Sequence, residues 1–121
     1  MKVKDIMVKP EVIGPKATVK DAAELMERLE TECLIVVSDS RVIGIITDGD
    51  IIARFIPMDR PSSQVKVNEI MSSKLIVLDP NEPIEYASHL MTEKNIKNIP
   101  VIQKNKMIGV LTASSILKHA P

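Results

Sequence analysis

Apolar and polar positions along the first half of the chain predict three short strands and two helices. The apolar runs of strand length are residues 12–13, 34–37 and 42–46. Residues 19–30 repeat apolar side chains at helical spacing, and Thr18 with Asp21 forms a variant of the capping box before them. The buried face predicted for this helix consists of Val19, Ala22, Ala23, Met26 and Leu29. A second helix is expected to begin after Thr47 and to carry Ile51, Ile52 and Phe55.

The second half repeats this order of elements. Its predicted strands are residues 76–78, 99–102 and 107–111. Pro83 suits the first position of the intervening helix, because its missing N–H would be unpaired there in any case. Thr112 opens the last helix. The order β-α-β-β-α, present twice, predicts an α/β (α+β) fold in which each first strand runs parallel to the second.

The two halves also share individual residues. Val3, Ile6 and Met7 recur 64 positions later, and a longer set recurs at an offset of 65. That longer set is Pro15, Ala22, Leu25, Met26, Val36, Ile43, Gly44, Thr47 and Ile51. Two copies are too few for a solenoid. We therefore expect two half-sized units, residues 1–56 and 67–121 with a linker at 57–66, that complete one another's core around a pseudo-twofold axis.

Composition removes several classes of function. Aromatic residues make up 2% of the chain, and 16 basic residues balance 16 acidic ones, so neither base stacking nor a basic field favours nucleic-acid binding. No apolar stretch is long enough to span a bilayer, and no signal region follows the N-terminus, so the cytosol is the expected compartment and no membrane partner is expected. The single cysteine, Cys33, opens an apolar run and is expected to be a buried structural thiol.

The corner where a strand meets the next helix, residues 44–50, holds the main candidate chemistry. A helix N-terminus offers free N–H groups to an anion, Thr47 can add a hydroxyl to a phosphate, and Asp50 can accept hydrogen bonds from a ribose diol. The same two residues also fit a plain capping box. The residues alone leave both interpretations open, and the two roles are compatible.

The corresponding corner of the second half keeps Thr112 but has Ser115 in the place of Asp50. A nucleotide site there is expected to be weaker, because the carboxylate is missing. His89 is expected to face solvent, and Asp48 with Asp50 lacks the remaining ligands of a metal loop, so no metal site is predicted. No nucleophile–base set is brought together by the repeat, so catalysis is not predicted either.

The double copy resembles a tandem pair of CBS domains, the modules named after cystathionine beta-synthase. The resemblance rests on residues 5–7 and 69–71, on the strand at 98–102 and on the corner at 44–50, and it covers essentially the whole chain. It implies a compact pair, often assembled into a homodimer, that binds adenosine-containing ligands between its copies. AMP and ADP are the first candidates, with ATP, NAD and S-adenosylmethionine as further members of the class.

The resemblance also implies which residues meet such a ligand. Thr47 corresponds to the residue on phosphate and Asp50 to the residue on ribose. The positions matching the adenine pocket are Val12, Ile13, Cys33 and Leu34, and in the second, weaker site Ile76, Val77, Asn98 and Ile99. Lys97 fits a position that often meets phosphate, but its counterpart Glu32 is acidic and would oppose a highly charged ligand such as ATP. Arg54 and His119, at equivalent helix positions, are either further phosphate contacts or solvated charges at a helix end.

The sequence thus predicts a regulatory sensor that has no catalytic cofactor, binds an adenosine-type small molecule and acts on an unidentified partner protein. The alternative is a ligand-free dimerisation or docking module whose two Thr corners serve only as helix caps.

Overall fold

The computed structural model describes residues 1–119, which form two compact units. One unit consists of Glu11–Leu75, and the other combines Met1–Pro10 with the chain from Ile76 onward. The elements of the first are β1 (Val12–Ile13), α2 (Val19–Leu29), β2 (Cys33–Ser38), β3 (Arg41–Thr47), α3 (Asp48–Asp50), a π-helical turn η1 (Ile51–Phe55), a 3₁₀ turn η2 (Ile56–Met58) and α4 (Val67–Ile70). Those of the second are α1 (Val3–Ile6), α5 (Ile84–Lys94), β4 (Asn98–Gln103), β5 (Lys106–Thr112) and α6 (Ala113–Lys118).

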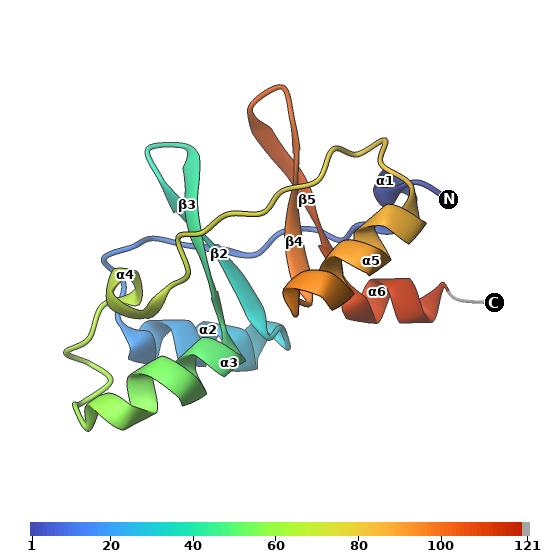
Figure 1. Cartoon of the computed structure of the whole chain (residues 1–121). Helices are drawn as coiled ribbons and strands as arrows, with labels where there is room; N and C mark the ends of the chain where they lie inside the picture. Colours follow the sequence, from blue (N-terminus) through green and yellow to red (C-terminus); the bar gives the residue numbers. More distant parts are fainter. Residues whose placement is uncertain (120–121) are drawn as a thin grey trace. The chain divides into compact units, whose positions relative to one another are not determined.

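An antiparallel hairpin forms the centre of each unit (Figure 1). In unit 11–75, β2 pairs with β3, and β1 adds to β2 in parallel, as the strand–helix–strand order predicts. The hairpin loops turn through Asp39 and Ser40 and through Lys104 and Asn105, all four with φ between 51° and 65°. Successive left-handed residues match the twist of a two-residue hairpin. Both hairpins also carry a bulge, after Val36 and after Val101.

The predicted first strand of the second half, residues 76–78, is wrong in part, because only Leu78 makes a bridge, to Val101. The repeat supplies the reason. In unit 11–75 the Ile35 N–H donates to the Glu11 carbonyl at 2.8 Å. The residue 65 positions after Ile35 is Pro100, which has no N–H to give to Ile76. The parallel ladder therefore shrinks to a single bridge.

The two long helices, α2 and α5, each bury an apolar face in the core of their own unit. In α2, Val19, Ala22 and Met26 are buried as predicted, whereas Ala23 and Leu29 are exposed and Leu25 takes their place on the core. The Thr18–Asp21 capping box forms in both directions at 3.0 Å. The hydrogen bond from the Thr18 N–H, followed by the interaction with the Thr18 side chain, holds the pKa of the exposed Asp21 carboxyl below its ordinary value. The helix that follows Pro83 begins one residue later than expected, with Pro83 as its N-cap.

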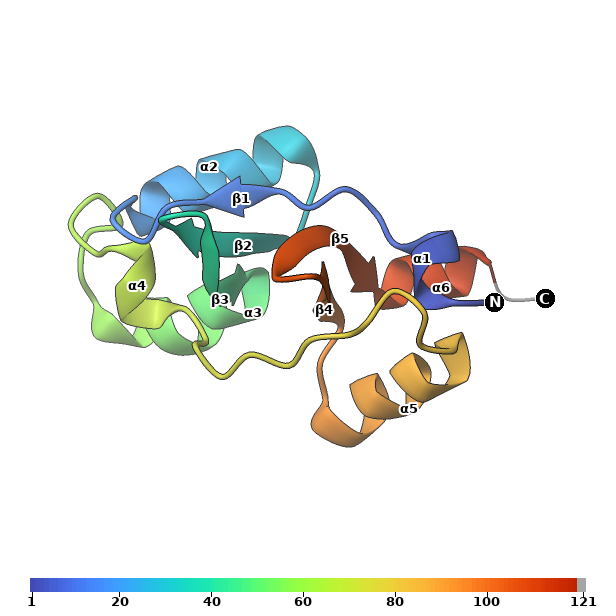
Figure 2. The ribbon, with the colours of Figure 1, turned by 90° about the horizontal axis from the view of Figure 1, so that it is seen from above.

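The opening helix of each sequence repeat packs into the unit built mainly from the other repeat. Val3 and Ile6 of α1 join the core of Leu78, Ala87, Ile99 and Leu111. Val67 and Ile70 of α4 join the core of Val19, Leu34, Ile46 and Phe55. Figure 2 shows α4 beside β3, within unit 11–75. The compact units therefore divide the chain differently from the repeat boundaries read from the sequence.

Candidate functional site

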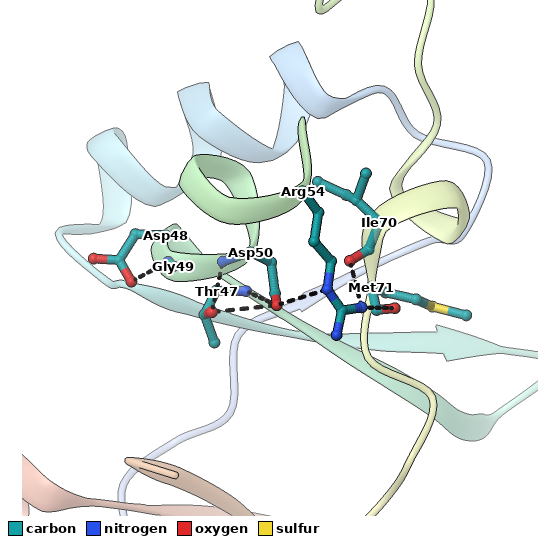
Figure 3. Close-up of polar contacts among 7 residues, drawn as sticks. All are labelled: Thr47, Asp48, Gly49, Asp50, Arg54, Ile70 and Met71. Atoms are coloured by element: carbon teal, nitrogen blue, oxygen red, sulfur yellow. Dashed lines mark hydrogen bonds and ion pairs between the residues drawn. The ribbon is translucent and has the colours of Figure 1, made fainter. Parts of the chain in front are cut away.

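The corner at the end of β3 is built by the side chain of Thr47. Its extended backbone (φ −122°, ψ 167°) ends the strand, and its Oγ1 accepts a hydrogen bond from the Asp50 N–H at 3.2 Å. In return, the Thr47 N–H and hydroxyl donate to Asp50 Oδ2 at 2.9 and 3.2 Å (Figure 3). The cap interpretation is therefore confirmed. A phosphate oxygen that accepts from this hydroxyl would replace Asp50 Oδ2 as its acceptor.

The other oxygen of Asp50 is engaged differently. Oδ1 faces the Arg54 Nε across 3.9 Å, a distance at which two charges attract but no hydrogen bond forms. The side chain of Asp50 is 16% exposed. One carboxylate oxygen is thus fixed by the cap while the second retains capacity to accept from a ligand hydroxyl.

Three carboxylates give this corner a negative field. The pKa of the Cys33 thiol is raised to about 12, first by burial and then by the charges of Asp50, Glu32 and Asp48. Glu32 also lies next to the corner through its backbone, because its carbonyl accepts the Asp48 N–H at 3.1 Å. Such a field opposes each negative charge that a ligand brings to the corner.

Seven of the eight residues proposed for the first site lie in unit 11–75. Cys33 is the direct partner of Thr47 in the β2–β3 ladder, and Val12 and Ile13 pair with the middle of β2. Val12 is exposed, whereas the side chain of Leu34 is wholly in the core, so a ligand would meet only main chain at Leu34. The eighth residue, Lys97, belongs to the other unit, where its carbonyl accepts the Ala113 N–H at 2.8 Å.

The second corner is closed more completely. The Ser115 hydroxyl donates to the Thr112 carbonyl at 2.8 Å and accepts from the Thr112 N–H at 3.2 Å, and the residue is 5% exposed. Asn98 pairs with Thr112 in the ladder, and Ile99 is fully buried. Ile76 and Val77 precede the single bridge at Leu78. This corner lacks the free carboxylate oxygen that Asp50 provides.

The sequence reasoning missed the partners of Arg54. Its Nη1 donates to the carbonyls of Ile70 and Met71, at 3.3 and 3.1 Å, where α4 ends. Arg54 is therefore bound within the protein, instead of being a free charge at a helix end. The Ile-Met pair recurs at 6–7 and 70–71, but nothing in the sequence pairs either copy with Arg54.

Within residues 1–119, no helix combines the length and apolarity needed to cross a membrane. Nor does that part of the chain bring three His, Cys, Asp or Glu side chains together in a way that fits a metal ion.

The described fold and sequence are similar to those of known proteins. One family, described as CBS domain, matches residues 3–56 and 67–121. An uncharacterized protein of Methanocaldococcus jannaschii is 33% identical over 119 residues, which make up 96% of this chain and 64% of that protein. The chain thus spans less than two thirds of the length of this relative.

Two solved structures reproduce the fold over nearly the whole chain. A crystal structure of a CBS domain has a TM-score of 0.92 and 27% identity, and the match covers 98% of this chain and 95% of that one. A CBS domain pair in complex with 5′-methylthioadenosine and S-adenosyl-L-methionine has a TM-score of 0.87 and 25% identity, covering 98% and 94% of the two chains.

Proposed function

The chain belongs to the CBS domain family, and from this premise we propose that it binds an adenosine-containing ligand at the Thr47–Asp50 corner. CBS-domain pair proteins are regulatory ligand-binding modules, and a structural neighbour holds two adenosine compounds. The observation that carries the proposal is the Asp50 carboxylate, which is oriented through Oδ2 by Thr47 and keeps Oδ1 for a donor such as a ribose hydroxyl. Val12 and Ile13 lie on β1 and Cys33 lies opposite Thr47, and these three residues would contact the adenine base.

The charges of the corner favour ligands with few phosphates. Glu32, Asp48 and Asp50 all act on Cys33, and each would repel an added phosphate charge. AMP and ADP are therefore preferred to ATP. S-adenosylmethionine, which is cationic at sulfur, suits the same field.

A thermal-shift panel of AMP, ADP, ATP, NAD and S-adenosylmethionine tests the proposal. A ligand present at 100 times its Kd adds about 2.7 kcal/mol of stability, which raises Tm by several degrees in a domain of this size. We expect the shift to disappear in Asp50→Ala. Ser115→Ala, the matched change at the second corner, is expected to keep it.

The second candidate function is a ligand-free docking or dimerisation module. The observation in its favour is that both Thr corners are closed by their own capping hydrogen bonds. It predicts that Asp50→Ala lowers the free energy of unfolding by about 1 kcal/mol and changes no ligand response. A panel without any shift in the wild-type chain would decide for this candidate.

We also propose that the chain forms a homodimer. Ile52 and Leu117 occupy equivalent positions in the two repeats and are 69% and 75% exposed, and Ile56 lies one turn after Ile52 with 62% exposed. Exposed large apolar side chains at the same position of both repeats favour a protein-facing surface.

A further inference from the structure

Arg54 joins the proposed ligand corner to a distant part of the sequence. Its Nε lies 3.9 Å from Asp50 Oδ1, while Nη1 donates to the carbonyls of Ile70 and Met71 (Figure 3). The guanidinium therefore bridges the carboxylate and the C-terminal end of α4. A planar guanidinium with several donors can hydrogen-bond the two carbonyls while its positive charge faces the carboxylate.

The end of α4 is itself bound to the strand that leads into the corner. Ser72 and Ile45 exchange two hydrogen bonds of 2.9 Å, and the Met71 side chain lies against Gly44. The segment from Ile70 to Ser72 is thus held at two points, by Ile45 on β3 and by Arg54. Both points are within a few residues of Thr47 or Asp50.

The second repeat has no equivalent of this bridge. His119 stands at the position of Arg54 and Ser115 at that of Asp50. Ser72 has a counterpart in Val8, which pairs with Val110 in the same way that Ser72 pairs with Ile45. The strand contact is therefore common to both repeats, and the Asp–Arg bridge distinguishes the corner that keeps a carboxylate.

We propose that Arg54 is a positioning residue that orients Asp50 for the ligand and couples ligand binding to the segment Ile70–Ser72. The proposal rests on the ligand site proposed above. A ribose hydroxyl that donates to Oδ1 fixes the carboxylate, which in turn holds the guanidinium against the two carbonyls. Ligand binding then tightens the end of α4, and through it the segment that connects the two repeats.

Three variants test the coupling, with AMP as the probe. Arg54→Ala removes the bridge, and Arg54→Lys keeps the charge but loses the fork. Arg60→Ala is the matched control, because Arg60 binds residues just before this segment, the Glu69 carboxylate and the Gln64 carbonyl (both 3.2 Å), without reaching the corner. The readouts are the Kd for AMP and the hydrogen-exchange rates of the Ile45 and Ser72 amides, with and without AMP.

In the wild-type chain, AMP is expected to slow exchange at both amides. Arg54→Ala should weaken AMP binding about fivefold or more and abolish this slowing. Arg54→Lys should give an AMP affinity and a degree of slowing between those of the wild-type chain and Arg54→Ala. Arg60→Ala should keep the AMP-dependent slowing and bind within about twofold of wild type.

Two results would overturn the inference, and only one of them would also overturn the proposed ligand site. If AMP and the other panel members fail to bind the wild-type chain, the ligand site and the coupling fall together. If AMP binds, but Arg54→Ala retains the AMP-dependent slowing or matches Arg60→Ala in affinity, the coupling is wrong and the ligand site stands.

Discussion

At the scale of single residues, Cys33 shows how the corner treats charge. Its side chain is 7% exposed and faces the field of three carboxylates, so the thiolate form is disfavoured twice. The expectation of a buried structural thiol is confirmed. The same negative charges would repel any anion that enters the corner. The raised pKa of Cys33 and the preference for adenosine ligands with few phosphates therefore have one cause.

We predict that Cys33 resists alkylation in the folded chain. Its pKa of about 12, against an ordinary value of 9.0, makes the thiolate fraction about a thousandfold smaller at pH 8. Iodoacetamide labelling followed by mass spectrometry should show slow modification in buffer and rapid modification in guanidinium. Equal rates in the two solutions would contradict the burial.

At the scale of elements, the opening helices α1 and α4 depend on glycines in the hairpins. A Cβ on Gly44 would meet Met71 Sδ at 2.6 Å and the Ser72 carbonyl at 2.9 Å. The three atoms nearest to a Cβ on Gly109 all belong to the Met7 side chain, with Sδ at 2.6 Å. In both repeats a methionine side chain packs against the hairpin glycine. At Gly44 the Ser72 carbonyl also lies too close to leave room for a Cβ.

Gly44→Ala is therefore expected to lower the free energy of unfolding more than Gly109→Ala. Overpacking costs about 1–3 kcal/mol, with Gly44→Ala near the upper end, because backbone cannot move aside as the Met7 side chain can. Gly14→Ala is the control, since nothing lies within 4 Å of its added Cβ. Chemical denaturation would measure the three, and equal losses for Gly44→Ala and Gly109→Ala would refute the explanation.

At the scale of the whole molecule, the proposed homodimer rests on large apolar side chains that are exposed and do not belong to either core. Phe55 is buried, yet Ile52 and Ile56 beside it on the same helical stretch are mostly exposed, and so is Leu117 in the other repeat. A helix that exposes large apolar side chains near its buried face has a second surface available for a protein partner.

Ile52→Glu is expected to shift the chain from dimer to monomer, because a charge buried in an apolar contact costs more than the contact provides. Light scattering after gel filtration would measure the mass. Tyr86→Glu, at another exposed apolar position (48%), is the control and should leave the mass unchanged. A wild-type chain that is already monomeric would exclude the dimer.

Much of this protein could be predicted from local pattern. Helical spacing and Thr18–Asp21 predicted α2, and the Thr47 and Thr112 caps follow from residue types three apart. These features depend on contacts within one turn of chain, which is why the sequence shows them directly. The shared residues of the two halves likewise predicted a repeated fold, and the family match confirms it.

Tertiary structure alone decided which segments complete which unit. Arg54 and Ile70, the last residue of α4, are 16 residues apart in the sequence, and no periodicity relates them. Folding brings the guanidinium to the carbonyls of Ile70 and Met71. It also decided that Ala23 of α2 faces outward while Leu25 packs on the core. Such outcomes depend on which groups meet across long separations in the chain, and local spacing carries no information about that.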